Sequence, residues 1–131
     1  MNKRFALLTT TATVSALLAV PTAAGAAPVR ADVEREKEGR CSASSHWDFS
    51  LEKEHGWIDV DVDIDSRSRG QKWKVTLTHE GRTVYSKTRT TDREGEIDVN
   101  KHVRNTRGKD KVTFRATNKS TGEVCRASLT I

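Results

Sequence analysis

Residues 58-IDVDVDID-65 alternate strictly between branched apolar side chains and aspartates. Successive side chains of a β-strand point to opposite faces of a sheet, so this alternation separates the two kinds of residue. The apolar set would face a dry interior and the aspartates would face water. We therefore predict a strand here with one buried and one solvated face. Its buried face would hold Ile58, Val60, Val62 and Ile64.

The same period of two recurs between Cys41 and Ile131, and turn signals such as 80-EGR-82 separate the segments. No convincing segment has the 3.6-residue period of a helix. Seven short strands with this spacing indicate an all-β protein, a seven-stranded antiparallel β-sandwich. The predicted strands cover residues 41–51, 58–64, 73–77, 82–90, 97–99, 112–116 and 125–131.

Two segments carry a family resemblance. The segment 112-VTFRATNKSTGEVCRASLTI-131 resembles the last hairpin of an immunoglobulin-like domain. The segment 73-WKVTLTHEGRTVYSK-87 is similar to the middle hairpin of immunoglobulin and fibronectin-type sandwiches. The resemblance implies an immunoglobulin-like fold, although the usual inter-sheet cysteine positions hold Phe114 and one of Val60 or Val62. The whole chain also resembles small secreted actinobacterial proteins, which implies export but no particular activity.

The front of the chain predicts export. Lys3 and Arg4 precede an uncharged, mostly apolar stretch, and 21-PTAAGAAP-28 follows it. These are the parts of a secretory signal peptide, and Ala26 fits the position before the cleavage site. We predict a signal peptide at residues 1–26, a charged disordered tail at 27–40 and the β-sandwich domain at 41–131. The product would be extracellular or associated with the cell wall, without a membrane span.

Cys41 and Cys125 are the two cysteines of the chain. An even cysteine count in an exported chain indicates a disulfide. Each cysteine shares the parity of the core-facing residues of its predicted strand, so a bond requires no distortion. We predict one disulfide between the first and last strands, with no zinc site.

The aspartates of 58-IDVDVDID-65 have three interpretations. A calcium site is disfavoured because neighbours on one face stand about 6.5 to 7 Å apart, although two of them with a loop carbonyl would suffice for weak binding. Catalytic carboxylates need a pKa raised by burial, which an open face does not supply. We predict a solvated face, with basic side chains on the adjacent strands because like charges repel. The candidate basic partners are Lys74, Lys87, Arg89, Lys111 and Arg115.

Charge divides the chain into two halves. Residues 27–65 carry 5 Lys and Arg against 11 Asp and Glu, whereas residues 66–131 carry 16 against 7. The basic half predicts binding to an anionic surface such as a cell-wall polymer, while nucleic acid is disfavoured because few aromatics accompany the charge. Trp57 is a candidate exposed contact residue. The candidate anion-binding residues are Arg67, Arg69, Lys72, Lys74, Lys101, Arg104, Arg107, Lys109 and Lys111.

No local signature of a catalytic nucleophile is present, and the histidines lie in separate segments without ligand spacing. We predict no catalytic residue, no metal and no cofactor, and we expect surface or turn positions for His46, His55, His79 and His102. The sequence favours a secreted, non-catalytic binding or structural protein at or outside the cell envelope. The alternative is a secreted inhibitor or ligand-binding protein that acts on an extracellular enzyme, with 101-KHVRNTRGKDK-111 as its loop. A small hydrolase is a third option.

Overall fold

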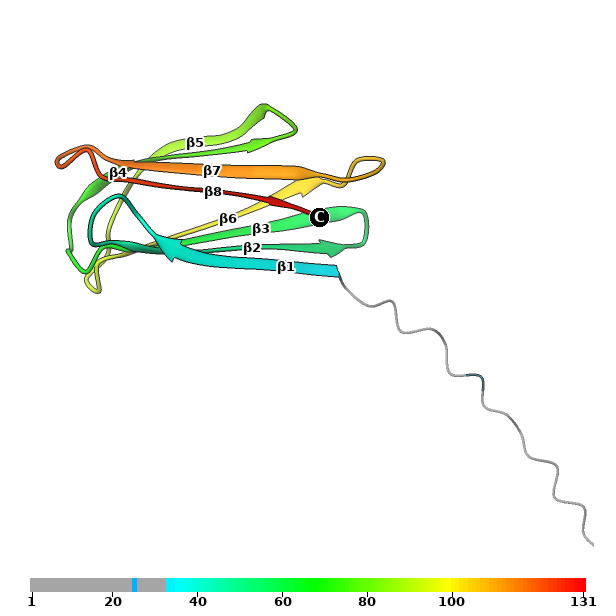
Figure 1. Ribbon diagram of the computed structural model, residues 1–131, viewed down its shortest axis with the longest axis horizontal. Helices are drawn as coiled ribbons and strands as arrows, with labels where there is room; N and C mark the ends of the chain where they lie inside the picture. The colour runs from blue at the N-terminus through cyan, green and yellow to red at the C-terminus, as the bar shows by residue number, and fades with distance from the viewer. Residues whose placement is uncertain (1–24, 26–32) are drawn as a thin grey trace, which may run out of the picture.

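The computed structural model describes Gly25 and residues 33–131. These residues form an all-β fold of two antiparallel four-stranded sheets that lie one on the other (Figure 1). Sheet A has the order β1-β2-β3-β6, and sheet B has the order β5-β4-β7-β8. Within the described residues there is no helix long and apolar enough to cross a membrane. The strands are β1 (Val33–Arg40), β2 (His46–Glu54), β3 (Trp57–Asp65), β4 (Lys72–His79), β5 (Arg82–Thr90), β6 (Glu96–Arg104), β7 (Lys111–Asn118) and β8 (Val124–Thr130).

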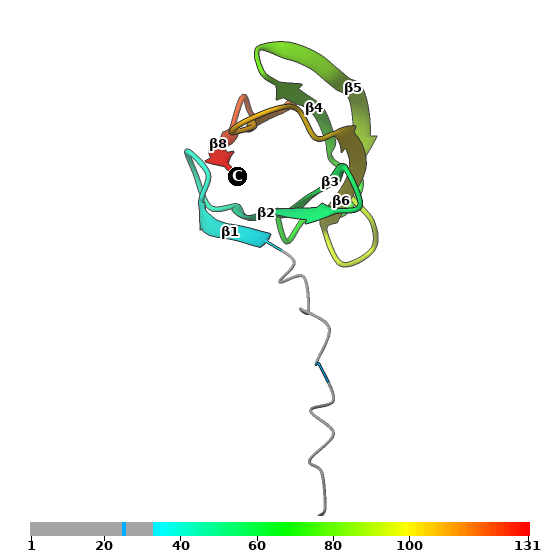
Figure 2. The same cartoon turned by 90° about the vertical axis from the view of Figure 1, so that its right-hand side faces the viewer.

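The core lies between the two sheets, which face each other across it in Figure 2. The alternation in β3 is confirmed, because Ile58, Val60, Val62 and Ile64 are all completely buried. Sheet B contributes Phe114, which meets the rings of Trp47 and Phe49 edge-on at centroid distances of 5.3 and 5.2 Å. Such edge-on contacts are a favoured arrangement of aromatic rings and add to the stabilisation from apolar burial.

The seven predicted strands correspond to β2–β8, and the structure adds an eighth. Strand β1 lies within the segment predicted to be a disordered tail, so that prediction is wrong for residues 33–40. Its side chains are mostly exposed, which is why composition predicted disorder, but its backbone pairs with β2 from Val33↔Lys53 to Arg40↔His46. The predicted signal peptide (1–26) and residues 27–32 of the tail lie outside the described residues, apart from Gly25.

Two hairpins close through two-residue turns in which both residues have positive φ. His55 and Gly56 have φ of 47° and 85°, and Glu80 and Gly81 have φ of 49° and 76°. This conformation matches the right-handed twist of the paired strands, and glycine adopts it without steric cost. The turn predicted at 80-EGR-82 is therefore confirmed.

The predicted disulfide between Cys41 and Cys125 is confirmed. Cys41 directly follows β1 instead of lying on the strand of Trp47, and Cys125 is buried in β8. Both β1 and β8 are edge strands, so the bond joins the two sheets along one side of the sandwich. Beside it, the buried Glu123 accepts hydrogen bonds from the backbone N–H of Ser45 (2.8 Å) and from its hydroxyl (2.9 Å).

Replacing Gly39 by valine should destabilise the protein by about 1 to 3 kcal/mol. A Cβ at Gly39 would lie 2.5 Å from Cζ2 of Trp47. That indole cannot retreat freely, because it packs on Phe114 and donates its Nε1–H to the Arg40 carbonyl at 3.2 Å. Urea denaturation followed by tryptophan fluorescence measures the loss.

The matched control is Lys37→Val, on the same face of β1 two residues earlier. Valine favours strands, so this control should keep or slightly raise stability. Equal stability of the two variants would contradict the close approach of Trp47 to Gly39.

Candidate functional site

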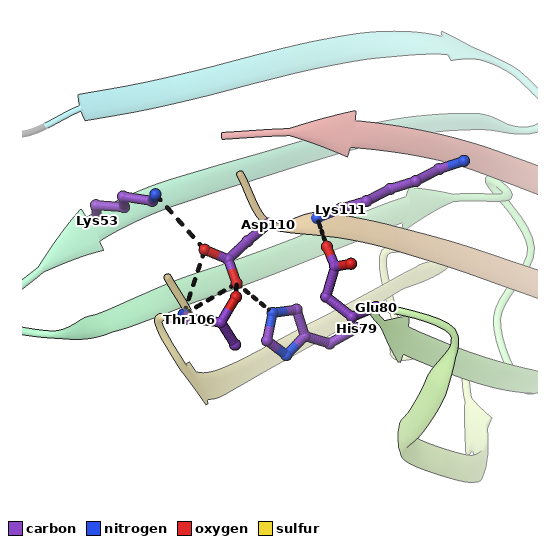
Figure 3. Close-up of polar contacts among 6 residues, drawn as sticks. All are labelled: Lys53, His79, Glu80, Thr106, Asp110 and Lys111. Carbon is purple, nitrogen blue, oxygen red and sulfur yellow. Dashed lines mark hydrogen bonds and ion pairs between the residues drawn. The ribbon is translucent and has the colours of Figure 1, made fainter. Parts of the chain in front are cut away.

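A buried polar cluster surrounds Asp110 at the end of the sandwich that also holds the C-terminus (Figures 1 and 3). The Asp110 side chain is fully buried, yet it is not isolated. Its Oδ1 accepts hydrogen bonds from the Thr106 backbone N–H (3.1 Å) and hydroxyl (2.6 Å), and lies 2.7 Å from Nε2 of His79. The ammonium of Lys53 is 3.6 Å from Oδ2. The carboxylate therefore joins three segments that are distant in sequence: β2, the end of β4 and the loop of Thr106 and Asp110 itself.

The pKa of Asp110 results from opposing influences. Burial raises it, because desolvation disfavours the charged form. The hydrogen bonds from the Thr106 hydroxyl, His79 and the Thr106 backbone, with the attraction of His79, outweigh burial and hold the pKa below its usual value. Asp110 is thus ionised in the folded protein at neutral pH.

His79, Glu80 and Asp110 are the one group of potential metal ligands found among the described residues, with ligand atoms within 4.8 Å of one another. A cation there would have to displace existing partners. Oδ1 of Asp110 is already engaged, Glu80 accepts a hydrogen bond from the backbone N–H of Lys111, and the Lys53 ammonium repels a second positive charge. This geometry fits a hydrogen-bonded anchor better than a metal centre.

The same cluster resembles part of a catalytic triad, with a buried carboxylate beside a histidine. A triad needs a nucleophile on the far side of the histidine from the carboxylate. Here the Thr106 hydroxyl and His79 both contact Oδ1 of Asp110, so the histidine is not placed between hydroxyl and carboxylate. These hydrogen bonds hold and orient the side chains of Thr106 and His79. The histidine is not placed to remove the proton from the threonine hydroxyl.

What the cluster does is hold the β6–β7 loop, residues 105–110. Asp110 also exchanges two backbone hydrogen bonds with Ile131, at 2.9 and 3.0 Å, and the Asn105 N–H donates to the Gly56 carbonyl at 3.0 Å. The loop is therefore tied at both ends while Arg107 and Lys109 stay exposed. The expectation that His79 is a surface or turn residue is wrong: it ends β4, and its side chain is only 11% exposed.

The outer face of sheet A is acidic across all four strands. Glu34 of β1 shares a cross-strand row with Glu52 and Asp59, and Glu38 shares another with Asp48 and Asp63. Between these rows, Glu36 lies opposite Ser50, which is opposite Asp61. Strand β6 adds two more carboxylates on the other side. We call this surface the acidic face. Its carboxylates are Glu34, Glu36, Glu38, Asp48, Glu52, Glu54, Asp59, Asp61, Asp63, Asp65, Glu96 and Asp98.

The prediction that basic strands flank the aspartates is therefore wrong. Asp63 is directly opposite Asp48 of β2 and Asp98 of β6. Other aspartates of β3 have polar partners: Asp59 is 2.9 Å from Nε2 of His102, and Asp61 accepts a hydrogen bond from Asn100 at 2.7 Å. The row Asp48–Asp63–Asp98 thus concentrates like charge at the middle of the face.

The pKa of Asp63 is raised by burial and by this crowding. Partial burial raises it above its usual value, and the negative charges of Asp98, Asp61, Asp48 and Glu96 raise it further. Each additional carboxylate nearby makes ionisation of Asp63 less favourable. The carboxyl group of Asp63 therefore stays protonated up to a higher pH in the folded state than in the unfolded chain.

We expect Asp63→Asn to raise stability at neutral pH. Between the unfolded pKa of about 3.9 and the raised folded pKa, the folded protein binds more protons, so stability falls as pH rises through that window. Above the window the repulsion acts in full, and the substitution removes it. Thermal melts from pH 3.5 to 8 at low salt should show a gain near pH 7 that shrinks towards acid.

Glu94→Gln removes one negative charge from the exposed β5–β6 loop and is the control, with stability nearly unchanged. If the Asp63 variant gained nothing, or gained equally at all pH values, repulsion within the row would not be the cause.

The outer face of sheet B has the opposite character. On the strand positions that face away from the core it carries cations among threonines and serines, and the register places Arg115 directly opposite Arg126. We call this surface the basic face. Its cations are Lys72, Lys74, Lys111, Arg115 and Arg126. Lys87 and Arg89, expected to point outward, lie instead on the core-side parity of the edge strand β5, opposite Val75 and Trp73.

The candidate anion-binding residues do not form one patch. Arg67 and Arg69 lie in the β3–β4 loop, at the opposite end of the sandwich from Arg107 and Lys109 in the β6–β7 loop (Figure 1). Lys101 and Arg104 belong to β6 in sheet A. Only Lys72, Lys74 and Lys111 share the basic face.

Trp57, the candidate contact residue, is exposed, with 45% of its surface accessible. It begins β3 on the same face as Asp59, at the edge of the acidic face. The Arg104 guanidinium lies 5.0 Å from the centroid of its ring, a distance typical of a cation–π contact. This pair presents an aromatic surface beside the carboxylates.

At the disulfide end, an open hollow of about 310 Å³ is lined mainly by hydroxyl and amide groups. Its acidic lining residue, Glu123, is already bound to Ser45, and Gln71 accepts a hydrogen bond from Asn118 at 3.0 Å. The hydroxyls of Ser42, Ser66 and Thr121 also make hydrogen bonds within the protein, so the lining of this hollow is polar but largely engaged.

Sequence reasoning missed both the Asp110 cluster and the acidic residues outside β3. The acidic residues of β1 do have a signal in the sequence: in 34-EREKE-38, glutamates alternate with cations at the period of a strand. The Asp110 cluster has no such signal, because Lys53, His79 and Thr106 come from three separate segments. No protein-family model matches the chain, and no curated protein sequence matches it.

Proposed function

We propose that the protein is an exported, non-catalytic β-sandwich that binds charged partners on its broad sheet faces, at or outside the cell envelope. One observation carries this proposal: the acidic face and the basic face lie on opposite sides of one small domain. The acidic face fits a cationic partner, and the basic face fits an anionic partner such as a cell-wall polymer. Complementary charge of this kind favours specificity and fast encounter.

The row Asp48–Asp63–Asp98, which forms no ion pair with any residue that the structure describes, supports the proposal. Like charges directly opposite on adjacent strands destabilise a sheet. The pKa of Asp63 is raised first by burial and then by the neighbouring carboxylates, Asp98 and Asp48 among them. A cationic partner would relieve the repulsion on binding. Local features that oppose folding are concentrated at functional sites, which favours a binding role for this face.

The finer fold assignment is also a proposal. Strands β2–β8 would form an immunoglobulin-like sandwich, with β1 as an added edge strand. Their division into three strands and four supports it, as do the β3–β4, β5–β6 and β6–β7 connections, each of which crosses from one sheet to the other. Export is tested separately: the first residue of the secreted product should be Ala27.

Binding to simple polymers tests the proposed function. We expect polylysine to bind the acidic face and polyglutamate the basic face, both with affinities that fall steeply as salt rises. Asp48→Asn, Asp63→Asn and Asp98→Asn together should weaken polylysine binding by at least about tenfold and leave polyglutamate binding intact. Retention on isolated cell walls that does not respond to salt would contradict the polymer assignment.

The reciprocal variant combines Lys74→Gln, Arg115→Gln and Arg126→Gln on the basic face. It should lose polyglutamate binding and keep polylysine binding, so each triple variant is the control for the other. Equal effects of both variants on both polymers would contradict binding by separate faces.

A secreted inhibitor of an extracellular enzyme is a second candidate, favoured by the tied β6–β7 loop. Rigid exposed loops lose little entropy on binding, and this loop presents Arg107 and Lys109 on a buried Asp110 anchor. Inhibition of extracellular proteases that Arg107→Ala abolishes would support it. Inhibition that is unchanged by Arg107→Ala and Lys109→Ala would contradict it.

A further inference from the structure

The acidic face and the basic face of this chain are complementary to each other. They point away from one another across the core, so one molecule cannot bring its own two faces together (Figure 2). We propose that the acidic face of one molecule stacks on the basic face of a second copy. This inference rests on the proposed function, because it names one partner that suits both faces.

Each face carries like charges directly opposite each other on adjacent strands, and stacking would relieve their repulsion. On the acidic face Asp63 lies between Asp48 and Asp98, and on the basic face Arg115 lies opposite Arg126. Both arrangements destabilise the isolated sheet. A contact that places the arginines over the carboxylates lowers both repulsions at once, which a contact between two identical faces cannot do.

The size of the faces predicts a weak contact. Four strands about 4.8 Å apart, each of about eight residues rising about 3.3 Å, give a surface of about 19 by 26 Å. That is roughly 500 Å² on each partner, or about 1,000 Å² in all, the lower limit for a specific interface. The contact is also mainly charged, so salt should weaken it strongly.

The symmetry of the contact decides the kind of assembly. Two different faces meet, so each molecule in a pair still has one free face of each charge. Such head-to-tail contacts extend into open chains unless the rotation between copies closes a ring. Association should therefore grow with concentration instead of stopping at a dimer.

Sedimentation velocity of the purified, disulfide-bonded protein tests this at about 20 mM salt, where charges interact over about 20 Å. We expect concentration-dependent association that is lost at physiological salt or above. The acidic-face variant, with Asp48, Asp63 and Asp98 changed to asparagine, should associate at least about tenfold more weakly. The basic-face variant, with Lys74, Arg115 and Arg126 changed to glutamine, should do the same.

Mixing the two variants is the decisive experiment. Each retains one intact face, so an equimolar mixture should form dimers and no larger species, although each variant alone stays monomeric. A mixture that stays monomeric overturns the inference, as does association of either variant at the wild-type strength. Wild-type protein that stays monomeric at about 20 mM salt but binds polylysine and polyglutamate also overturns it, and leaves the proposed function standing.

Discussion

Removing the Cys41–Cys125 bond should lower the free energy of unfolding by about 4 to 5 kcal/mol. The two cysteines are 84 positions apart, and cross-linking a loop of that length removes much of the conformational entropy of the unfolded chain. A domain of this size is typically stable by about 5 to 15 kcal/mol, so the change consumes a large share of the total. The midpoint of thermal unfolding should fall by about 15 to 35 °C.

Guanidinium denaturation of a variant with Cys41→Ser and Cys125→Ser measures this loss. Chemical reduction of the wild-type protein should reproduce it, and reduction of the double variant should change nothing further. Glu123 and Ser45 hold the same pair of loops through hydrogen bonds. A loss below about 1 kcal/mol would mean that these bonds, and not the disulfide, hold β1 and β8 together.

Replacing Asp110 by asparagine should cost about 3 to 5 kcal/mol, the usual cost of breaking a buried ionic network from one side. Asparagine has the same shape but no charge, so the Lys53 ammonium and His79 lose their anion. The Thr106 hydrogen bonds weaken as well, and the β6–β7 loop should open. Urea denaturation gives the energy, and faster amide hydrogen exchange at residues 105–110 would locate the effect.

The loss caused by Asp110→Asn should depend on pH. The folded pKa of Asp110 is below its usual value of about 3.9, so its contribution is present above that pH and disappears as pH falls through the folded pKa. The wild-type and variant stabilities should therefore converge in acid. Glu94→Gln, an exposed carboxylate elsewhere, should cost less than about 0.5 kcal/mol at any pH. A constant gap at all pH values would contradict an ionised Asp110.

Much of the fold was predictable because strand alternation is a local property. The polarity of each side chain in 58-IDVDVDID-65 indicates which face of the sheet it occupies. The buried and the solvent-exposed residues can therefore be assigned without knowledge of the neighbouring strands. The disulfide followed from the cysteine count, since Cys41 does not lie on the strand of Trp47 as its predicted parity required. Strand β1 was missed because disorder was inferred from its lack of apolar side chains, whereas an edge strand forms largely by backbone pairing with the neighbouring β2.

The charged faces show the limit of this reasoning. The sequence contains an acidic half and a basic half, and cross-strand repulsion predicted that the two would interleave. The structure places the acidic half and the basic half on different sheets instead. The β3–β4 connection carries the chain from sheet A to sheet B at the point where acidic residues give way to basic ones. Strand β6 then returns to sheet A with Glu96 and Asp98, which completes the acidic face.

The sequence by itself determined the positions of β2–β8 and the dry side of strands such as β3, because these depend on alternation along one segment. The disulfide pairing followed from the presence of two cysteines in the chain. Only the tertiary structure decided which strands are neighbours. That choice placed Asp63 between two other aspartates and brought Lys53, His79, Thr106 and Asp110 to one point. Contacts between distant segments depend on how the strands are ordered in the sheets and how the sheets stack. The sequence of a single strand does not specify which strands will pair with it.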